Sequence, residues 1–549
     1  MDQRKADLVI YSKKIYTVAK DDFLDGGIAV TGNSITAVGS REEIEPLVGS
    51  GTLVLERGEQ MVMPGFIEGH THVDGSIIKK SRVDLVGVES EGECVRMVKA
   101  WDDAHPEEPW VYGFGWHIAN WPTNLYPTKK SLDRVLPRKP VTLIDLGCHA
   151  IWMNSKALET LGITGEPIDL KAKFGYEGNV IRDDKGEPTG LVNDGPMMML
   201  NAQSTAFMKS EPERYMAEAA ADHLEKGITS INEMWLHGDG DMYIDALKSL
   251  EDQGKLKFRV FFQYDLVNGD VENAAAAKKR FCSDKLRLVG VKGFADSVWA
   301  DRSASVVRAY GDDPGNFGHL YIDFDTWAPK VAAANKNSLS VHMHCSGNGA
   351  VRRTLDLYQY SWEKNGPGDY RNSVEHCDTV TPEDIPRFGK YKVMANVSPD
   401  FMSKTNKWKD SPCHYVYDDE TRSWCWPFAS MLEAGTVITY GCDCPASDFN
   451  PFTQIYRGAA RVMDDGEPSG GFLPDEKIPV KTALRFYTYN GAYEARMEDK
   501  LGTLEAGKLA DIIVLDRNIL ELPLEEMRKA QVLITIADGK IVYEKDNNK

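Results

Sequence analysis

The chain lacks the features of a membrane-spanning or nucleic-acid-binding protein. No apolar run approaches the roughly 18 residues that cross a bilayer. The first residues, Met-Asp-Gln-Arg-Lys, pass directly into strand-like sequence without the apolar core of a signal peptide. Basic residues are in the minority, with 64 Lys and Arg against 83 Asp and Glu, and the net charge is −19. This balance argues against nucleic acid or an anionic membrane surface as the main partner.

Cysteine is scarce and does not form a disulfide framework. The nine cysteines are odd in number and have no regular spacing, which predicts reduced thiols and a cytoplasmic location. Repeats and low-complexity tracts are absent as well. What is present is the composition of a globular protein, with 42% hydrophobic residues in 549. That length can bury a large core and favours two or three domains.

Short strand-like segments occur at both ends of the chain. Too few lie at either end for a stable sheet, so we expect one small β-sandwich domain built from residues 1–62 and 500–549. The segments are 6–11, 14–18, 27–30 and 34–38 near the N-terminus, and 510–515, 532–536 and 540–543 near the C-terminus.

Between these ends, strand-like runs alternate with helical patterns, as in residues 211–226, which open on Glu-Pro-Glu. Eight such strands close an α/β barrel of the (β/α)8 TIM type, which we expect over residues 63–499. The strands are the one that ends at His72, then 227–234, 258–264, 288–292, 339–344, 373–376, 392–397 and 437–443.

A ninth strand candidate, 140–146, lies in a long interval rich in Trp, Gly, Pro and Asn. Insertions in βα loops land at the mouth of such a barrel. We therefore assign residues 77–205 to an inserted subdomain over the barrel mouth.

Two histidines one residue apart lie at the end of the first barrel strand. Side chains alternate along a strand, so His70 and His72 face the same way. Two imidazoles on one face suit a divalent metal such as zinc, although the pair alone also arises by chance.

Later strands end on further residues that can bind a metal, and polar residues at the C-terminal ends of barrel strands are typical of active sites. Each has a plain alternative. A single histidine is often a hydrogen-bonded core residue, Lys292 could form a salt bridge, and Asp443 could open a turn. Their meeting at one barrel mouth makes coincidence the weaker explanation. The residues are Lys292, His344, His376 and Asp443.

Several motifs resemble the metal-dependent amidohydrolase superfamily, and within it amidohydrolase family 3, the branch of YtcJ-like proteins and N-substituted formamide deformylase. The catalytic motifs are His70-Thr-His72, His344-Cys-Ser-Gly-Asn-Gly-Ala, Val374-Glu-His376 and Gly441-Cys-Asp443-Cys-Pro. Segments 133–141, 149–158, 186–191 and 502–511 point to the same branch.

The resemblance implies a binuclear centre of two divalent ions, zinc or else manganese, bridged by a CO2-derived carbamate on Lys292. One ion would be held by His70, His72, Lys292 and Asp443, and the other by Lys292, His344 and His376. A metal-bound hydroxide would attack the substrate, and Asp443 would act as general base and then general acid.

The chain departs from the family pattern at a few positions. His342 forms a second His-X-His with His344, and we expect it to be buried behind the metal ligands. The family commonly has an acidic residue at the position of Asn348 and a glutamine near the position of Ser398. The cysteines beside the ligands should be small buried residues, because alternation turns them away from the site; they are Cys345, Cys377, Cys442 and Cys444.

Candidate substrate contacts come from the inserted segment and from the barrel loops. A tryptophan-rich rim suits an apolar substrate, although the same residues could pack the insertion onto the barrel. The candidates are Trp116, His117, His149, Asn154, Asp296 and Trp426.

The sequence thus predicts a metal-dependent hydrolase that cleaves a C–N bond in an amide, N-acyl or N-formyl compound. The same site could open an ester or a lactone, and a deaminase or decarboxylase is a weaker alternative. A catalytically silent binding protein is the rival from another class, but it would be expected to have lost some ligands. The expected partner is a small molecule, with a homodimer left open.

Overall fold

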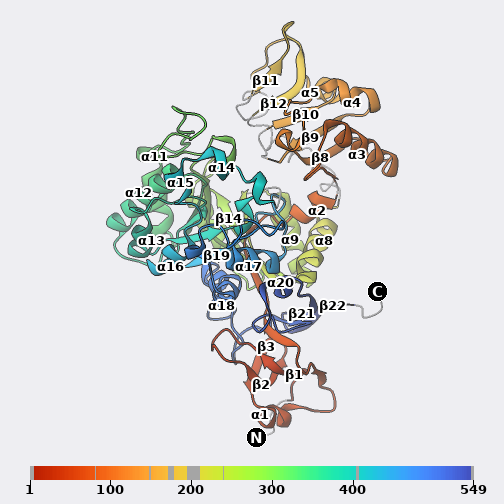
Figure 1. The fold of residues 1–549 in the computed structure, drawn as a ribbon. Helices are drawn as coiled ribbons and strands as arrows, with labels where there is room; N and C mark the ends of the chain where they lie inside the picture. The colour runs from red at the N-terminus through yellow and green to blue at the C-terminus, as the bar shows by residue number, and fades with distance from the viewer. Residues whose placement is uncertain are drawn as a thin grey trace. The chain divides into compact units, whose positions relative to one another are not determined.

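The computed structural model describes residues 5–80, 82–146, 150–170, 179–193, 211–238, 240–403 and 407–545 (Figure 1). The chain divides into two compact units. The first consists of Met1–Val73 together with Met216–Lys549, and the second is Asp74–Tyr215. No helix among the described residues is long and apolar enough to span a bilayer.

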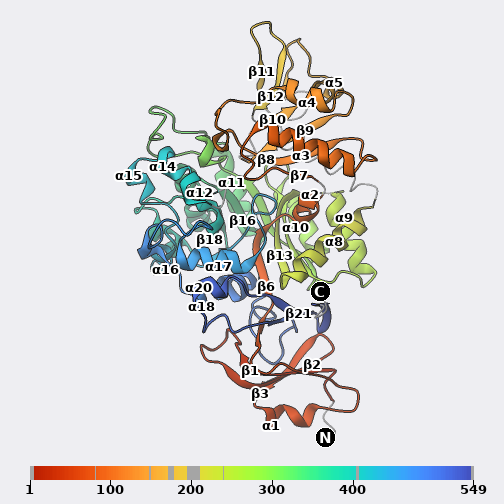
Figure 2. The ribbon, with the colours of Figure 1, turned by 45° about the vertical axis from the view of Figure 1, so that its right-hand side comes forward.

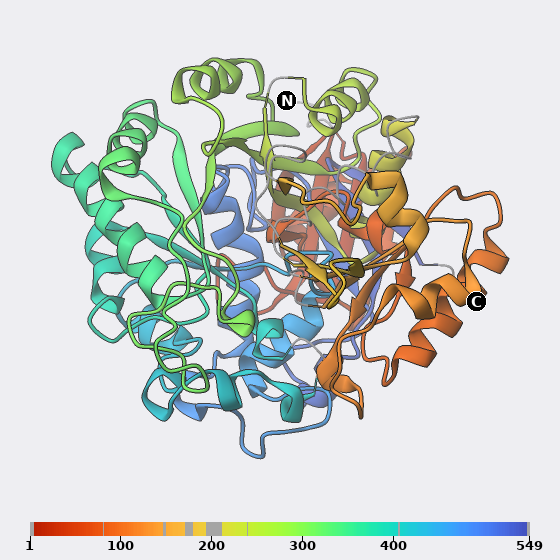
Figure 3. The same ribbon diagram turned by 90° about the horizontal axis from the view of Figure 1, so that it is seen from above.

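The first unit contains the predicted barrel, a sheet of eight parallel strands in the order β19-β18-β17-β16-β15-β14-β13-β6. Its two ends meet where the Asp443 amide donates to the His70 carbonyl oxygen at 2.8 Å. Figure 3 views the barrel from one end, with helices on its outside. The strands are β6 (Phe66–Thr71), β13 (Ile228–His237), β14 (Arg259–Asp265), β15 (Leu286–Phe294), β16 (Ser340–Cys345), β17 (Ser373–His376), β18 (Met394–Val397) and β19 (Ile438–Tyr440).

The helices between these strands begin at well-defined caps. The side chains of Asp241, Asp270 and Asp323 accept backbone N–H groups in the first turns of α9, α10 and α11, which are otherwise left without partners. The helix predicted over 211–226 is α8 (Pro212–Glu225). The others include α9 (Met242–Asp252), α10 (Val271–Arg280), α11 (Phe324–Lys336), α12 (Asn348–Asn365), α13 (Ile385–Tyr391), α16 (Phe428–Glu433) and α17 (Pro451–Ala460).

Both ends of the chain form one eight-stranded β domain, as predicted. Strand β5 of the N-terminal part pairs antiparallel with β20 of the C-terminal part, where Met63 lies opposite Ile513. Figure 2 shows the red and blue strands of this domain side by side. The strands are β1 (Leu8–Ile15), β2 (Leu24–Thr31), β3 (Ser34–Gly39), β4 (Leu53–Glu56), β5 (Met61–Pro64), β20 (Ile512–Leu515), β21 (Val532–Ala537) and β22 (Lys540–Glu544).

Two details of this domain differ from the prediction. The segments 6–11 and 14–18 belong largely to one strand, β1, whose register with β2 shifts between Ser12 and Ile15. Gly65 separates β5 from β6, and a Cβ there would lie 2.4 Å from the Thr229 side chain. Only glycine therefore lets the chain pass from the β domain into the barrel at this point.

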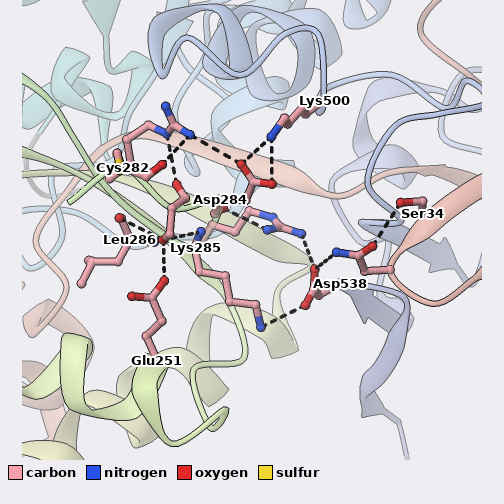
Figure 4. Close-up of polar contacts among 12 residues, drawn as sticks. Ser34, Glu251, Cys282, Asp284, Lys285, Leu286, Lys500 and Asp538 are labelled. Atoms are coloured by element: carbon pink, nitrogen blue, oxygen red, sulfur yellow. Dashed lines mark hydrogen bonds and ion pairs between the residues drawn. The ribbon is translucent and has the colours of Figure 1, made fainter. Parts of the chain in front are cut away.

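Ion pairs join the barrel to the β domain at the start of β14 and β15 (Figure 4). The Arg259 guanidinium donates to both oxygens of Asp511, at 2.8 and 2.9 Å, and to Asp538 at 3.2 Å. Lys285 Nζ lies 3.3 Å from Asp538, and Lys500 Nζ lies 2.8 Å from Asp284. Each of these charged side chains at the junction thus has a partner of opposite charge.

The second unit has its own sheet and core. Its strand order is β11-β12-β10-β9-β8-β7, and the ninth strand candidate is β9. Trp116, Trp121 and Trp152 pack in the core. The strands are β7 (Val83–Asp84), β8 (Val111–Trp116), β9 (Val141–Asp145), β10 (Ala150–Met153), β11 (Asn179–Arg182) and β12 (Pro188–Asn193). The helices include α3 (Glu91–Ala104), α4 (Lys129–Val135) and α5 (Ser155–Leu161).

Candidate metal centre

Three of the predicted ligands converge at the C-terminal end of the barrel. His70 lies in β6, His72 follows it, and Asp443 follows β19. The Asp443 Oδ1 atom lies 2.9 Å from His72 Nε2 and 3.4 Å from His70 Nε2. One ligand atom from each residue lies within 4.8 Å of the other two. Two imidazoles and a carboxylate at this spacing fit one divalent ion.

The charge state of this group fits an ion site. Burial alone would raise the pKa of Asp443, but His70 and His72 hold it well below the usual range. Burial likewise opposes protonation of His72, yet Asp443 and Glu233 raise its pKa to about 9. The carboxylates of Asp443 and Glu233 thus favour a positive charge at His72.

His344 and His376 extend the row of imidazoles away from His72. The ring centroids of His70 and His376 are 4.7 Å apart, and those of His376 and His344 are 4.4 Å apart. Burial and the neighbouring histidines hold the pKa of His376 well below its usual value, so its ring is neutral. A neutral imidazole has a lone pair for a metal.

Two of the candidate ligands have strained backbones. His376 has φ +70° and Asp443 has φ +54°, in the left-handed region that costs about 1–2 kcal/mol for an ordinary residue. Such strain persists where surrounding contacts over-determine the conformation, and it is concentrated at functional sites.

Lys292 is buried in the barrel interior on β15, opposite His342 of β16. Burial lowers the pKa of its amine, although Glu375 and Asp443 act in the opposite direction. A lowered pKa favours the neutral amine, which is the form that can react with CO2.

Acids lie behind three of the histidines; Glu375 and Glu233 were not predicted, and Asp296 was predicted only as a substrate contact. Glu375 Oε2 lies 2.6 Å from His70 Nδ1, and Glu233 Oε1 lies 3.6 Å from His72 Nδ1. Asp296 Oδ1 lies 3.4 Å from His344 Nδ1. His342 is fully buried, as expected, and its Nδ1 atom lies 3.2 Å from the second oxygen of Glu375.

Strict alternation along strand β17 does not predict that Glu375 lies beside His70. We assumed that the neighbour of a ligand points toward the helices, whereas Glu375 points into the barrel. His376, at the end of β17, returns to the same side because its backbone is left-handed. The run Glu375-His376 carried a signal, since a carboxylate beside a ligand is a candidate partner for another ligand.

Three half-buried aromatic rings stack on the candidate ligands. Trp235 lies 4.0 Å from His72, Phe294 lies 5.2 Å from His344, and Phe401 lies 5.7 Å from His376, between ring centroids. The rings follow the carboxyl ends of their strands or lie close to them. They restrict the imidazoles and make the surroundings apolar.

The candidate substrate contacts of the inserted segment lie in the second unit. Trp116 is buried, and its indole N–H donates to the Leu143 carbonyl oxygen at 2.9 Å. Asn154 is also buried, caps α5 and donates to two carbonyl oxygens of the preceding loop. These contacts give both residues structural roles. His117 is half-buried after β8, and His149 lies outside the described residues.

The two candidate substrate contacts from the barrel are buried as well. Asp296 accepts the backbone N–H groups of Ser305, Ser346 and Gly347 at 2.8–3.0 Å, which fixes the loops around His344. The Trp426 indole N–H donates to Asp378 at 3.2 Å. Both side chains thus serve to hold loops of the site.

The departures from the family pattern have structural roles. The Asn348 amide oxygen accepts from the Val307 amide at 2.8 Å, and Ser398 accepts from the Gln454 side chain at 3.3 Å. A glutamine from α17 therefore lies at Ser398. The cysteines beside the ligands are buried free thiols, as expected: Cys345, Cys377, Cys442 and Cys444.

Relatives cover nearly the whole chain. It is 27% identical over 554 residues to Protein LONG AFTER FAR-RED 3 of Arabidopsis thaliana, covering 98% of this chain and 92% of that protein. It is 25% identical over 560 residues to N-substituted formamide deformylase of Arthrobacter pascens, covering 98% of both. Putative amidohydrolase YtcJ of Bacillus subtilis (strain 168) is 24% identical over 534 residues, covering 97% of this chain and 98% of the relative.

A solved structure shares the fold. An uncharacterized metal-dependent hydrolase from Pyrococcus horikoshii OT3 superposes with a TM-score of 0.75 at 23% identity, covering 94% of this chain and 99% of that one. A family model described as the amidohydrolase family matches residues 58–543, from the end of the N-terminal β segment to the last strand. The chain is therefore a member of the amidohydrolase family.

Proposed function

We propose that this protein is a metal-dependent hydrolase that cleaves the C–N bond of an amide, an N-acyl or N-formyl compound. The observation that carries the proposal is the convergence of His70 Nε2, His72 Nε2 and an Asp443 carboxylate oxygen at the end of the barrel. The similarity to N-substituted formamide deformylase supports an amide as the substrate.

The donor set suits one or two divalent ions, zinc first and manganese second. Once bound, such ions would polarise the scissile carbonyl and acidify water to a pKa of roughly 7. His70, His72 and Asp443 would hold one ion, and His344 and His376 would hold the other. Lys292 would complete this donor set as an anionic carbamate, formed when its neutral amine adds to CO2 and releases a proton.

Asp443 would move the proton in this reaction. Its lowered pKa keeps the carboxylate ionised at neutral pH, so it can accept a proton from the attacking water. It would then pass this proton to the leaving nitrogen, which departs as a neutral amine. Glu233, Glu375 and Asp296 would hold the imidazoles in place during both steps.

The test combines metal analysis, a substrate panel and one variant. The purified protein is assayed with zinc or manganese on N-formyl and N-acyl amides and on esters of matched shape. We expect amide hydrolysis, and a loss of about 10³-fold in Asp443→Asn with the circular dichroism spectrum unchanged.

Each other outcome selects a different function. Hydrolysis of the esters without the amides would favour an esterase or lactonase. A protein that holds no metal and stays inactive after metal is added would favour the silent binding protein. Unchanged turnover in Asp443→Asn would refute the proton-transfer role.

A further inference from the structure

We propose that Glu375 is a positioning residue that fixes the tautomer and orientation of His70; the inference depends on the metal-binding part of the proposed function. Glu375 Oε2 lies 2.6 Å from His70 Nδ1, and both side chains are buried. The carboxylate accepts the Nδ1–H of the imidazole, which leaves the lone pair on Nε2. That atom faces Asp443, where the ion would bind.

Glu375 is itself held from its other end. Its Oε1 atom accepts the Ser373 hydroxyl and lies 3.2 Å from His342 Nδ1. His342 Nδ1 also lies 2.8 Å from the Ser373 oxygen. Because both carboxylate oxygens are engaged, the side chain cannot rotate away from His70 without leaving buried polar groups unpaired.

The four candidate histidine ligands differ in how closely a carboxylate approaches the imidazole from behind. The acids behind His72 and His344 lie at 3.6 and 3.4 Å, beyond a good hydrogen bond. Among the described residues, no carboxylate oxygen lies within 4.0 Å of a His376 ring nitrogen. Glu375 and His70 therefore form the tightest acid–imidazole contact of the centre, and we expect its loss to affect metal binding most.

Glu494 offers a matched control. It is as deeply buried as Glu375 and belongs to the same network, with Oε1 3.7 Å from His342 Nδ1. Its other oxygen accepts from Asn232 at 3.2 Å. Glu494 has no close contact with His70, so its substitution disturbs the network without removing the contact in question.

The cluster of His342, Glu375 and Glu494 also resembles a metal site, since its ligand atoms lie within 4.8 Å of one another. The hydrogen bonds favour a different role. Oxygens of Glu375, Ser373 and Glu494 surround His342 Nδ1, and the Ser373 hydroxyl donates to Glu375, so this nitrogen is placed to donate a hydrogen bond rather than to bind an ion. The cluster therefore serves to hold the Glu375 carboxylate in place.

The test compares Glu375→Gln with Glu494→Gln in the full-length protein. Zinc affinity is measured by competition with a chromophoric chelator, and the cobalt-substituted proteins are compared by their visible absorption spectra. Loss of an acid behind a metal-binding histidine typically weakens metal binding 10–100-fold. We expect a loss of that size and an altered cobalt spectrum in Glu375→Gln, and a change below about threefold in Glu494→Gln.

The outcomes separate this inference from the proposed function. Wild-type protein that binds no zinc or cobalt would refute the proposed function itself. Wild-type affinity in Glu375→Gln, or an equal loss in both variants, would overturn the positioning role alone. If Glu375→Gln does not fold, Ser373→Ala replaces it: removing a single hydrogen bond to Glu375 should weaken zinc binding severalfold, and an unchanged affinity would overturn the inference.

Discussion

The two ends of the barrel handle buried charge in opposite ways. At the end next to the β domain, Arg259 and Lys285 face Asp511 and Asp538, so positive and negative groups balance. At the other end, carboxylates collect in the interior near the buried amine of Lys292, whose pKa is lowered by burial. These acids are Glu68, Glu233, Asp296, Glu375 and Asp443.

The difference shows how a structural charge cluster can be told from a functional one. Burying an unpaired charge is costly, so a stable interior pairs its charges or binds a metal. The junction with the β domain meets this requirement with its own side chains. At the upper end burial raises the pKa of Glu68 to about 8, and the remaining carboxylates and histidines there form a group that could hold a metal ion.

The strongest way to break the comparison is to remove the Lys292 amine at the upper end. Methionine has about the length of lysine but no nitrogen, so Lys292→Met can form no carbamate. We expect activity to fall by about 10³-fold, the scale of losing a group that stabilises charge in the reaction. The metal content should fall by about one ion per chain, measured by mass spectrometry of digested protein. Retention of both would contradict the bridging role.

The next largest effect belongs to the lower end. Arg259→Met leaves Asp511 buried without its partner, which should lower the free energy of unfolding by about 3–5 kcal/mol, measured in urea. Zinc affinity of the folded protein should be unchanged. Lys500→Met is the control, because the Lys500–Asp284 pair is half-exposed and should contribute less than about 1 kcal/mol. Equal effects of the two variants would show that burial of the pair is unimportant.

The smallest effect depends on pH. Burial alone would raise the pKa of Asp538, but Arg259 and Lys285 lower it below the usual 3.8. Its contribution to stability is therefore present above pH 3.8 and is lost as the pH falls through the folded-state value. Asp538→Asn should lower stability by about 1 kcal/mol at pH 7, with the difference shrinking below about pH 4. Urea unfolding at several pH values measures it, and a constant difference would contradict the assignment.

The fold is predicted well from the sequence because the periodicity of apolar residues indicates which residues are buried. Apolar runs of four to eight residues gave the eight barrel strands, and the strands at both termini gave the composite β domain. The second barrel strand was read as ending at Met234, whereas β13 continues to His237. The prediction therefore includes Glu233 but misses the last residues of the strand toward the barrel mouth, which include Trp235 and His237.

The candidate site was predictable where residue type and spacing determine the chemistry, as for His70 and His72. The orientation of Glu375 was not, because it depends on the left-handed backbone of His376, which no local pattern reveals. The roles of the residues in the inserted segment were harder still to predict. A tryptophan such as Trp116 looks the same in sequence whether it lines a pocket or fills a core.

The pairing of β5 with β20 bears on how the protein is synthesised. Met63 leaves the ribosome 450 residues before its partner Ile513. Until then one edge of β5 is exposed, and an exposed strand edge invites association with other chains. The nascent protein must therefore protect this edge until β20 is made, and we expect chains truncated before residue 512 to aggregate.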